Sequence, residues 1–148
     1  MTRNLLLFGF MAFILPVSVA RADLGSELLR ASGTSGGLIV HLGCADGHLT
    51  AALGADNHCL VHGLAGDWSA VETARAHVHA LGVYGRISID RFSGETLPYE
   101  ENVVNLLVST DSETAVPVGE ILRVLAPGGV AMAKAGSAGL PAPWSDSD

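Results

Sequence analysis

The sequence predicts an α/β fold built on one mostly parallel sheet of about five strands. Two observations carry this prediction. Short apolar runs, typical of strands buried on both faces, alternate along the chain with segments of helical periodicity. Glycine and proline clusters separate these segments, and strand–helix alternation implies right-handed crossovers between parallel strands. The 148 residues fit one domain, whose core we place at residues 36–134.

The N-terminal half predicts two strand–helix units behind a short leading helix. The expected elements are a helix at residues 24–31, a strand at 38–42, a helix at 48–53, a strand at 58–64 and a helix at 67–81. Ser69 and Glu72 have the spacing of a capping box at the start of the last helix. Its expected apolar face consists of Val71, Ala74, Val78 and Leu81.

The C-terminal half predicts two further strands, one helix and a short final strand. In order, we expect a strand at residues 86–92, a polar loop at 93–101, a strand at 103–108, a polar loop at 109–114, a helix at 118–125, a turn at 126–129 and a strand at 130–133. Residues 135–148 are rich in Gly, Ala, Pro and Ser, which predicts a flexible tail or a linker.

The first 22 residues have the pattern of a secretory signal peptide. Arg3 precedes an apolar run at residues 5–17, and Ala20 and Ala22 form a small-x-small cleavage site. The run has 13 residues, whereas a membrane-spanning helix needs about 20. We therefore expect an exported protein, cleaved before Asp23, that has no stable membrane span after cleavage. The alternative is an uncleaved N-terminal anchor.

Charge and cysteine usage narrow the function classes. The formal net charge is −7, and loss of Arg3 and Arg21 with the leader would make it −9. No basic stripe remains, so nucleic acid is not an expected partner.

Cys44 and Cys59 fall at opposite ends of neighbouring predicted strands, which places them too far apart for a disulfide. We expect two free thiols.

The segment at residues 40–47, Val-His-Leu-Gly-Cys-Ala-Asp-Gly, carries the clearest chemical signal. A buried strand runs into a turn of small residues and then into a helix. Small residues let the backbone approach a ligand, and ligands of open α/β sheets bind at the carboxyl ends of the strands. Gly43, Ala45 and Gly47 give a G-x-A-x-G spacing, which differs from the G-x-G-x-x-G of dinucleotide folds.

This segment resembles motif I of the class I S-adenosylmethionine-dependent methyltransferases. Residues 61–64 resemble the family's second strand, and Leu97-Pro98-Tyr99 resembles its leucine-proline-aromatic loop. Residues 121–129 are similar to its helix and turn before the fifth strand. The resemblance spans about residues 36–134. It is particularly like the methyltransferase-like segments that precede a pyrroloquinoline-quinone-type β-propeller in exported bacterial proteins.

The resemblance implies a Rossmann-like three-layer sandwich that binds S-adenosylmethionine and methylates an acceptor that the sequence does not identify. The implied cofactor contacts are His41, Gly43, Cys44, Ala45, Asp46 and Gly47 on the methionine side, Ala65 and Asp67 at the ribose, and Ser93, Gly94 and Glu95 at the adenine. Asp111 is the implied residue of the transfer site, and Trp68 is expected on the cofactor-side rim.

The chain departs from the family pattern where carboxylates are usual. His41, Ala65, Ser93 and Asn105 stand at positions that are acidic in the family, although Asp67 could substitute or simply start a helix. The last two strands of the family's sheet are also missing. The strand near Val130 would then need a protein partner or a second copy over its edge, unless the chain is the front part of a longer protein. A degenerate, non-catalytic binding or scaffold module is therefore the alternative function.

Histidine and cysteine chemistry is the remaining alternative. The six histidines lack the close pairs of a strong zinc signature, so we expect no metal site. The turn contains no serine for a hydrolase elbow. Cys44 at a helix start would make a nucleophile, but the resemblance implies a small packing residue there.

Overall fold

The computed structural model describes residues 17–110 and 116–133, with side chains described from Leu24 onward. The elements in chain order are α1 (Val17–Ser32), β1 (Gly37–Leu42), α2 (His48–Leu53), β2 (Cys59–Ala65), α3 (Trp68–Ala80), β3 (Ile87–Arg91), β4 (Val104–Ser109), α4 (Val118–Val124) and β5 (Leu125–Ala133). Asp111 and Trp144 lie outside the described residues, as do most of the expected leader and the expected tail.

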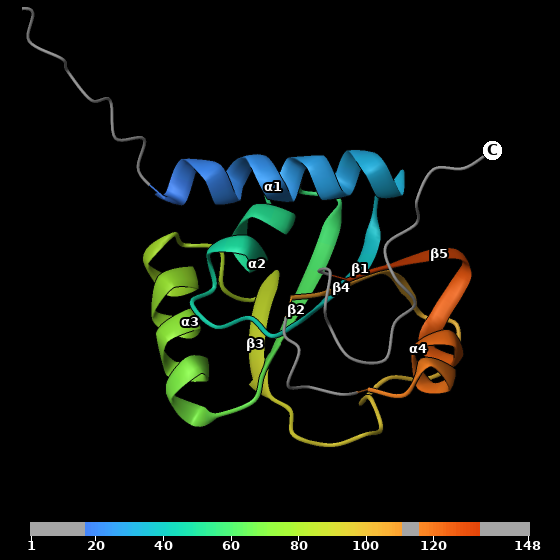
Figure 1. Cartoon of the computed structure of the whole chain (residues 1–148). Helices are drawn as coiled ribbons and strands as arrows, with labels where there is room; N and C mark the ends of the chain where they lie inside the picture. Colours follow the sequence, from blue (N-terminus) through green and yellow to red (C-terminus); the bar gives the residue numbers. More distant parts are fainter. Residues whose placement is uncertain (1–16, 111–115, 134–148) are drawn as a thin grey trace, which may run out of the picture.

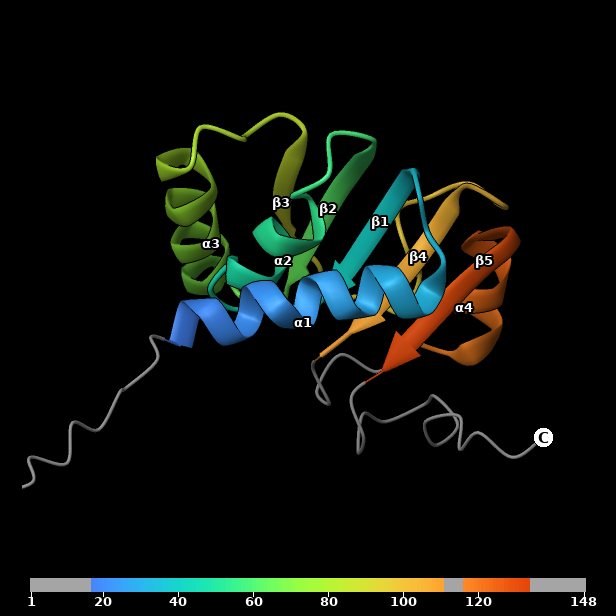
Figure 2. The ribbon, with the colours of Figure 1, turned by 90° about the horizontal axis from the view of Figure 1, so that it is seen from above.

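The five strands form one all-parallel sheet, as the alternation of elements predicts. Their order is β3-β2-β1-β4-β5, which Figure 2 shows side by side. Strands β2 and β3 lie on one side of β1, and the chain then crosses back so that β4 and β5 lie on the other side of β1. In open α/β sheets, ligands bind at the carboxyl ends of the strands where the order reverses. The ends of β1 and β4 therefore mark the expected ligand site.

Side chains on the two faces of the sheet form two separate cores, which makes the fold a three-layer sandwich. On one face Ile39, Val61 and Ile89 pack with residues of α2 and α3, and Leu28 and Leu29 of α1 add to this cluster. The opposite face packs against α4 and the loop between β3 and β4. Figure 1 shows α3 beside β3 at one edge of the sheet and α4 near β5 at the other.

Asn105 has a structural role at the amino end of β4. The β1–β4 register shifts between Leu38 and Ile39, so that Asn105 lies opposite no residue of β1. Its Oδ1 accepts the Leu38 N–H at 3.0 Å. A Cβ at Gly37 would lie 2.0 Å from the same oxygen, which explains the glycine there. Asn105 is therefore at the edge of the sheet opposite to the expected ligand site.

Helix α3 corrects the capping prediction. Asp67 is the N-cap residue, and its side chain accepts the Ala70 N–H at 2.9 Å. Ser69 lies inside the first turn, so the predicted Ser69–Glu72 capping box is wrong. Leu81 is also wrongly placed in the apolar face, because it is 53% exposed beyond the helix end.

The first helix and the last strand also differ from their predicted bounds. Helix α1 begins at Val17 and passes through the expected cleavage position. Strand β5 begins directly after α4, at Leu125, which was expected to end the helix before a turn at residues 126–129. The β4–β5 register then shifts, and regular pairing resumes at Val130, so the predicted glycine turn lies within the strand as an irregularity.

Two further expectations concern the cysteines and the membrane. Cys44 and Cys59 are both free and buried, which confirms the two free thiols. Within residues 17–110 and 116–133, no helix combines the length and hydropathy that a membrane crossing requires.

The corrected cap yields a first test. Asp67→Ala removes the acceptor of the Ala70 N–H and is expected to lower the free energy of unfolding by about 1 kcal/mol. Ser69→Ala should leave it within about 0.5 kcal/mol of the wild type. Chemical denaturation monitored by circular dichroism measures both. Equal losses in the two variants would contradict the assignment of Asp67 as the cap.

Candidate functional site

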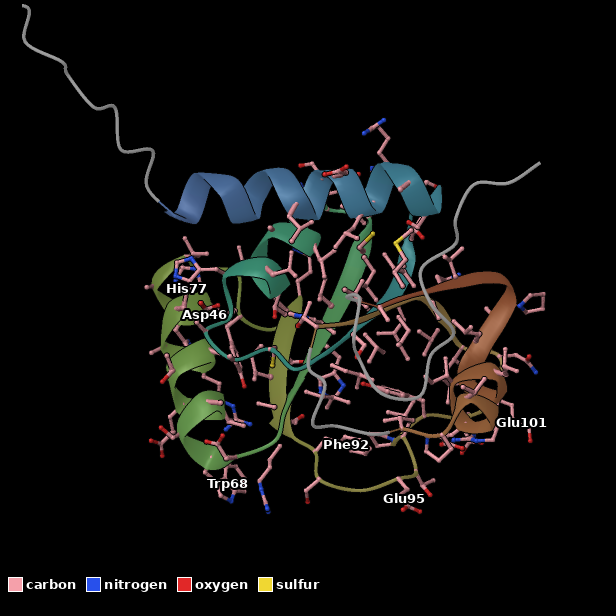
Figure 3. The ribbon with its side chains drawn as sticks, viewed as in Figure 1. Asp46, Trp68, His77, Phe92, Glu95 and Glu101 are labelled. Atoms are coloured by element: carbon pink, nitrogen blue, oxygen red, sulfur yellow. The ribbon has the colours of Figure 1, made fainter. Side chains whose placement is uncertain are left out.

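The implied cofactor contacts come from three loops at one edge of the sheet. Because the strands are parallel, the residues that follow β1, β2 and β3 all emerge at the carboxyl edge. The turn at 43–47, the turn at 65–67 and the loop at 93–95 are therefore brought to that edge. In Figure 3, Trp68 and Glu95 lie at the lower end of the molecule, and Asp46 lies higher, beside His77 of α3.

The turn after β1 depends on a glycine with left-handed backbone geometry. Gly43 has φ 84°, a value that a residue with a Cβ adopts only with strain. Its N–H and that of Cys44 both donate to the Leu64 carbonyl of β2, at 2.8 and 3.2 Å. The Ala45 N–H turns back to the Gly43 carbonyl at 2.9 Å. The chain therefore leaves the sheet in a tight bend that exposes Ala45 at the edge.

Gly47 ends this turn and serves helix packing. It has φ 77°, and a Cβ there would lie 2.9 Å from the Ala74 carbonyl oxygen of α3. The close approach brings the start of α2 against α3. Asp46, next to it, accepts the His48 N–H with its Oδ1 at 3.1 Å. The side chain of Asp46 therefore helps to order the beginning of α2.

His41 is buried and fully engaged within the protein. It is 3% exposed, its Nδ1 lies 2.8 Å from Thr50 Oγ1 and its Nε2 lies 2.9 Å from Thr110 Oγ1. The Thr110 hydroxyl is also within donating distance of the Leu42 and Gly43 carbonyls. Burial lowers the pKa of His41 to about 4. The ring is therefore neutral at pH 7 and joins β1, α2 and the end of β4 beneath the turn.

Cys44 has the character of a packing residue. It is 1% exposed and belongs to the core shared with α2 and α3. A Cβ at Gly63 would lie 2.8 Å from its sulfur, so the thiol fills the space over β2. Burial raises the pKa of the Cys44 thiol to about 12. A protonated, enclosed thiol is a poor nucleophile, which argues against covalent catalysis at this position.

At the nucleoside end of the edge, where the resemblance places the ribose and adenine of the cofactor, few side chains are free to accept a hydrogen bond. Ala65 ends β2, is 2% exposed and offers no side-chain oxygen. Asp67 uses its carboxylate to cap α3. Ser93, Gly94 and Glu95 are exposed in the loop after β3. The structure thus brings these residues to the expected edge, and their contacts with a cofactor remain predictions.

Two side-chain arrangements near this edge were not predicted in full. The Arg91 guanidinium at the end of β3 lies 5.9 Å from the centre of the Trp68 ring. A second set fixes the loop between β3 and β4: Tyr99 Oη lies 2.6 Å from His62 Nδ1, His62 Nε2 lies 2.9 Å from Asp90, and Arg75 donates to Asp90 at 2.7 Å. Burial and the Asp90 charge raise the pKa of Tyr99. No sequence spacing would have revealed either set, because the partners come from different elements.

Metal ligands and the implied transfer residue are the last of the expected functional groups. Across the part of the chain that the structure describes, no three His, Cys, Asp or Glu side chains converge as a metal site would require. His48 and His77 contact each other through their rings, with centroids 3.8 Å apart. Asp111, the implied transfer residue, lies outside the described residues, directly after Thr110.

The comparison with family sequence models identifies one family. Residues 39–129 match the sequence model of a family described as "Methyltransferase domain". No curated protein sequence matches the chain.

Solved structures share the fold at low sequence identity. A proposed S-adenosylmethionine-dependent methyltransferase from Methanococcus maripaludis has a TM-score of 0.71 and 21% identity, over 80% of this chain and 57% of that one. The cyclase SpnF has a TM-score of 0.66 and 24% identity, over 74% of this chain and 43% of that one. Geranyl diphosphate C-methyltransferase from Streptomyces coelicolor, in complex with S-adenosyl-L-homocysteine, has a TM-score of 0.65 and 16% identity. The match covers 76% of this chain and 46% of that one. The chain therefore spans about half the length of these proteins.

The buried histidine predicts an acid-sensitive fold. Because the pKa of His41 falls from 6.5 to about 4 on folding, the unfolded chain takes up a proton first as the pH drops. The stability contribution is complete above pH 6.5 and is lost between pH 6.5 and 4, by about 3 kcal/mol. Denaturation at a series of pH values should show this loss in the wild type. His41→Gln should lower stability at pH 7 and flatten the slope in that window; an unchanged slope would contradict the assignment.

Gly47 and Gly82, two of the glycines with left-handed backbone geometry, give a matched test of the packing at the turn. Gly47→Ala meets backbone atoms of Ala74 as well as strain, and should cost about 2–4 kcal/mol. Gly82→Ala, at φ 70° with nothing within 4 Å of the added Cβ, should cost only about 1–2 kcal/mol. Denaturant midpoints measure the difference. Similar losses would show that α2 and α3 separate easily at Gly47.

Proposed function

The chain belongs to the methyltransferase domain family, and on that premise we propose that it binds S-adenosylmethionine and transfers its methyl group to an acceptor. The single observation that carries this proposal is the left-handed turn at Gly43, fixed to the Leu64 carbonyl beside the reversal point of the sheet. This turn brings backbone to the edge where ligands of such sheets bind. The complexes of neighbours with S-adenosylmethionine or S-adenosyl-L-homocysteine support the choice of cofactor.

The residues present fit the amino-acid end of this cofactor better than its nucleoside end. Around Gly43 and Ala45 the small side chains leave the turn backbone open to a ligand. At the ribose position, Ala65 supplies no carboxylate, and the loss of a charged acceptor costs about 1.5–3 kcal/mol of binding. Asp67 is the nearest acidic residue in sequence, but its carboxylate caps α3. We therefore propose weak binding in which the turn contributes most.

The chain's own part in methyl transfer would be to bind and orient. The cofactor supplies an electrophilic methyl group, and in-line displacement needs mainly proximity and alignment. Beneath the turn, His41 and the two threonines hold β1 and β4 in a fixed relation, so the ends of both strands keep their spacing. Asp111 follows Thr110 in the sequence, and we propose it as the residue nearest to the acceptor.

A non-catalytic binding or scaffold module is the second candidate. The lack of a ribose carboxylate at Ala65 favours it, because a degenerate site can keep the fold and lose the cofactor.

We propose export through the N-terminal leader, in keeping with the resemblance to segments that precede exported β-propellers. Under this proposal a protein partner or a second copy covers β5 near Val130, which is an edge strand of the described sheet.

Titration with S-adenosyl-L-homocysteine tests the proposed function. Isothermal calorimetry on the purified chain is expected to show saturable binding in the micromolar range. Ala45→Leu adds bulk at an exposed position of the turn and should abolish binding without changing stability. Leu122→Ala, at a residue of α4 that is 64% exposed, is the control. Absence of binding at millimolar ligand would exclude the enzyme and leave the scaffold.

The leader is tested separately. Expression of the full chain in a bacterium with a general secretion pathway should yield a periplasmic or secreted protein that begins at Asp23. Mass spectrometry of the intact product gives its N-terminus. A cytoplasmic product that retains the first 22 residues would contradict export.

A further inference from the structure

Trp68 is an aromatic side chain that the fold does not need. It is the first residue of α3, at the carboxyl edge of the sheet, and it is 58% exposed. The buried face of α3 consists of Val71, Ala74 and Val78, and Asp67 provides the cap. The exposed part of this indole is therefore free to contact another molecule, and Trp is among the residue types enriched at binding surfaces.

Arg91 lies against this indole and makes two contacts there. Its guanidinium carbon is 5.9 Å from the centre of the Trp68 ring, and its Nε donates to the Gly66 carbonyl at 3.4 Å. Arg75 and Arg123 have carboxylate partners, and Arg86 donates to two carbonyls. Among the described residues, no carboxylate lies within ion-pair distance of Arg91.

The backbone beside this pair is open at Gly66. A Cβ at Gly66 would meet no atom within 4 Å. Ala65, the residue before it, has no polar side chain, and the Asp67 carboxylate is bound to the Ala70 N–H. An indole and a cation therefore flank an open corner at the end of β2, in a chain whose formal net charge is −7.

The chemistry of this corner suits an aromatic base that carries a negative group. Bases stack on exposed aromatic rings, and guanidinium groups bind phosphate through paired N–H donors. In dinucleotide-binding α/β folds, an acid at the end of the second strand selects a free ribose, and an arginine accommodates a ribose phosphate. We propose that Trp68 and Arg91 form a subsite for a purine nucleoside that carries a phosphate on its ribose. This goes beyond the proposed function, because it adds a ligand class and does not require methyl transfer.

Calorimetry with three probes on the full chain tests the subsite. Adenosine 2′-phosphate should bind about tenfold or more tightly than adenosine, since a charge-assisted hydrogen bond is worth about 1.5–3 kcal/mol. Inorganic phosphate alone should bind more weakly than either nucleoside. Equal affinity for adenosine and its phosphate would overturn the role of Arg91. Inorganic phosphate binding as tightly as the nucleotide would overturn the role of Trp68.

Matched variants separate the two side chains. Arg91→Gln should remove the preference for the phosphate, whereas Arg30→Gln, which makes the same charge change on the exposed surface of α1, should leave it intact. Trp68→Leu should weaken the binding of adenosine and of adenosine 2′-phosphate about tenfold, in line with the energy of base stacking. Trp68→Phe keeps an aromatic ring and should retain most of the affinity. With Trp144 replaced by Phe, the fluorescence of Trp68 should be quenched by adenosine 2′-phosphate. An unquenched signal under saturation would contradict stacking.

The outcome for this subsite is independent of the outcome for the cofactor. Binding of S-adenosyl-L-homocysteine together with no phosphate preference would overturn the subsite and keep the proposed function. A phosphate preference that depends on Arg91, with no binding of S-adenosyl-L-homocysteine, would support the subsite and overturn the proposed function.

Discussion

The carbonyl of Leu64 is the contact on which the site depends. It accepts two N–H groups, those of Gly43 and Cys44, and thereby fixes the direction in which the chain leaves β1. Only a residue that tolerates φ near 84° could make this bend, so glycine is required at position 43. The bend places Cys44 inward against β2 and Ala45 outward at the edge. One side of the turn therefore belongs to the core, and the other faces the edge where we propose that the cofactor binds.

Elements whose local pattern agrees with their packing could be predicted from the sequence. The run at residues 38–42 is apolar because both faces of β1 are buried, and the helix at His48–Leu53 has the predicted bounds. The start of α3 was predicted to within one residue, but its cap was not, because Asp67 and Ser69 are both good caps and lie two residues apart. The partners of His41 are separated from it by 9 and 69 residues, so only the fold shows that this ring is a structural bridge.

The loop between β3 and β4 has no helix to order it, and side chains take that role. Glu120 of α4 accepts the Leu97 N–H at 2.7 Å, and Arg123 donates to the Leu97 carbonyl at 3.3 Å. Hydrogen bonds from Arg123 lower the pKa of Glu120 to about 2, so this contact persists across the physiological range. Tyr99 fixes the loop to β2 through His62. With both ends of the leucine-proline-aromatic segment held, the neighbouring residues 93–95 are kept at the carboxyl edge.

The two ends of the edge differ in the charge that they present. The turn after β1 presents backbone and the exposed Ala45, because the Asp46 carboxylate accepts the His48 N–H. The corner after β2 lacks an acid at Ala65 and presents Arg91, which suits an anion. A ligand with a neutral ribose would gain from the first end and little from the second. If both proposed sites are correct, charge at the nucleoside end distinguishes S-adenosylmethionine, whose ribose is neutral, from a nucleoside that carries a ribose phosphate.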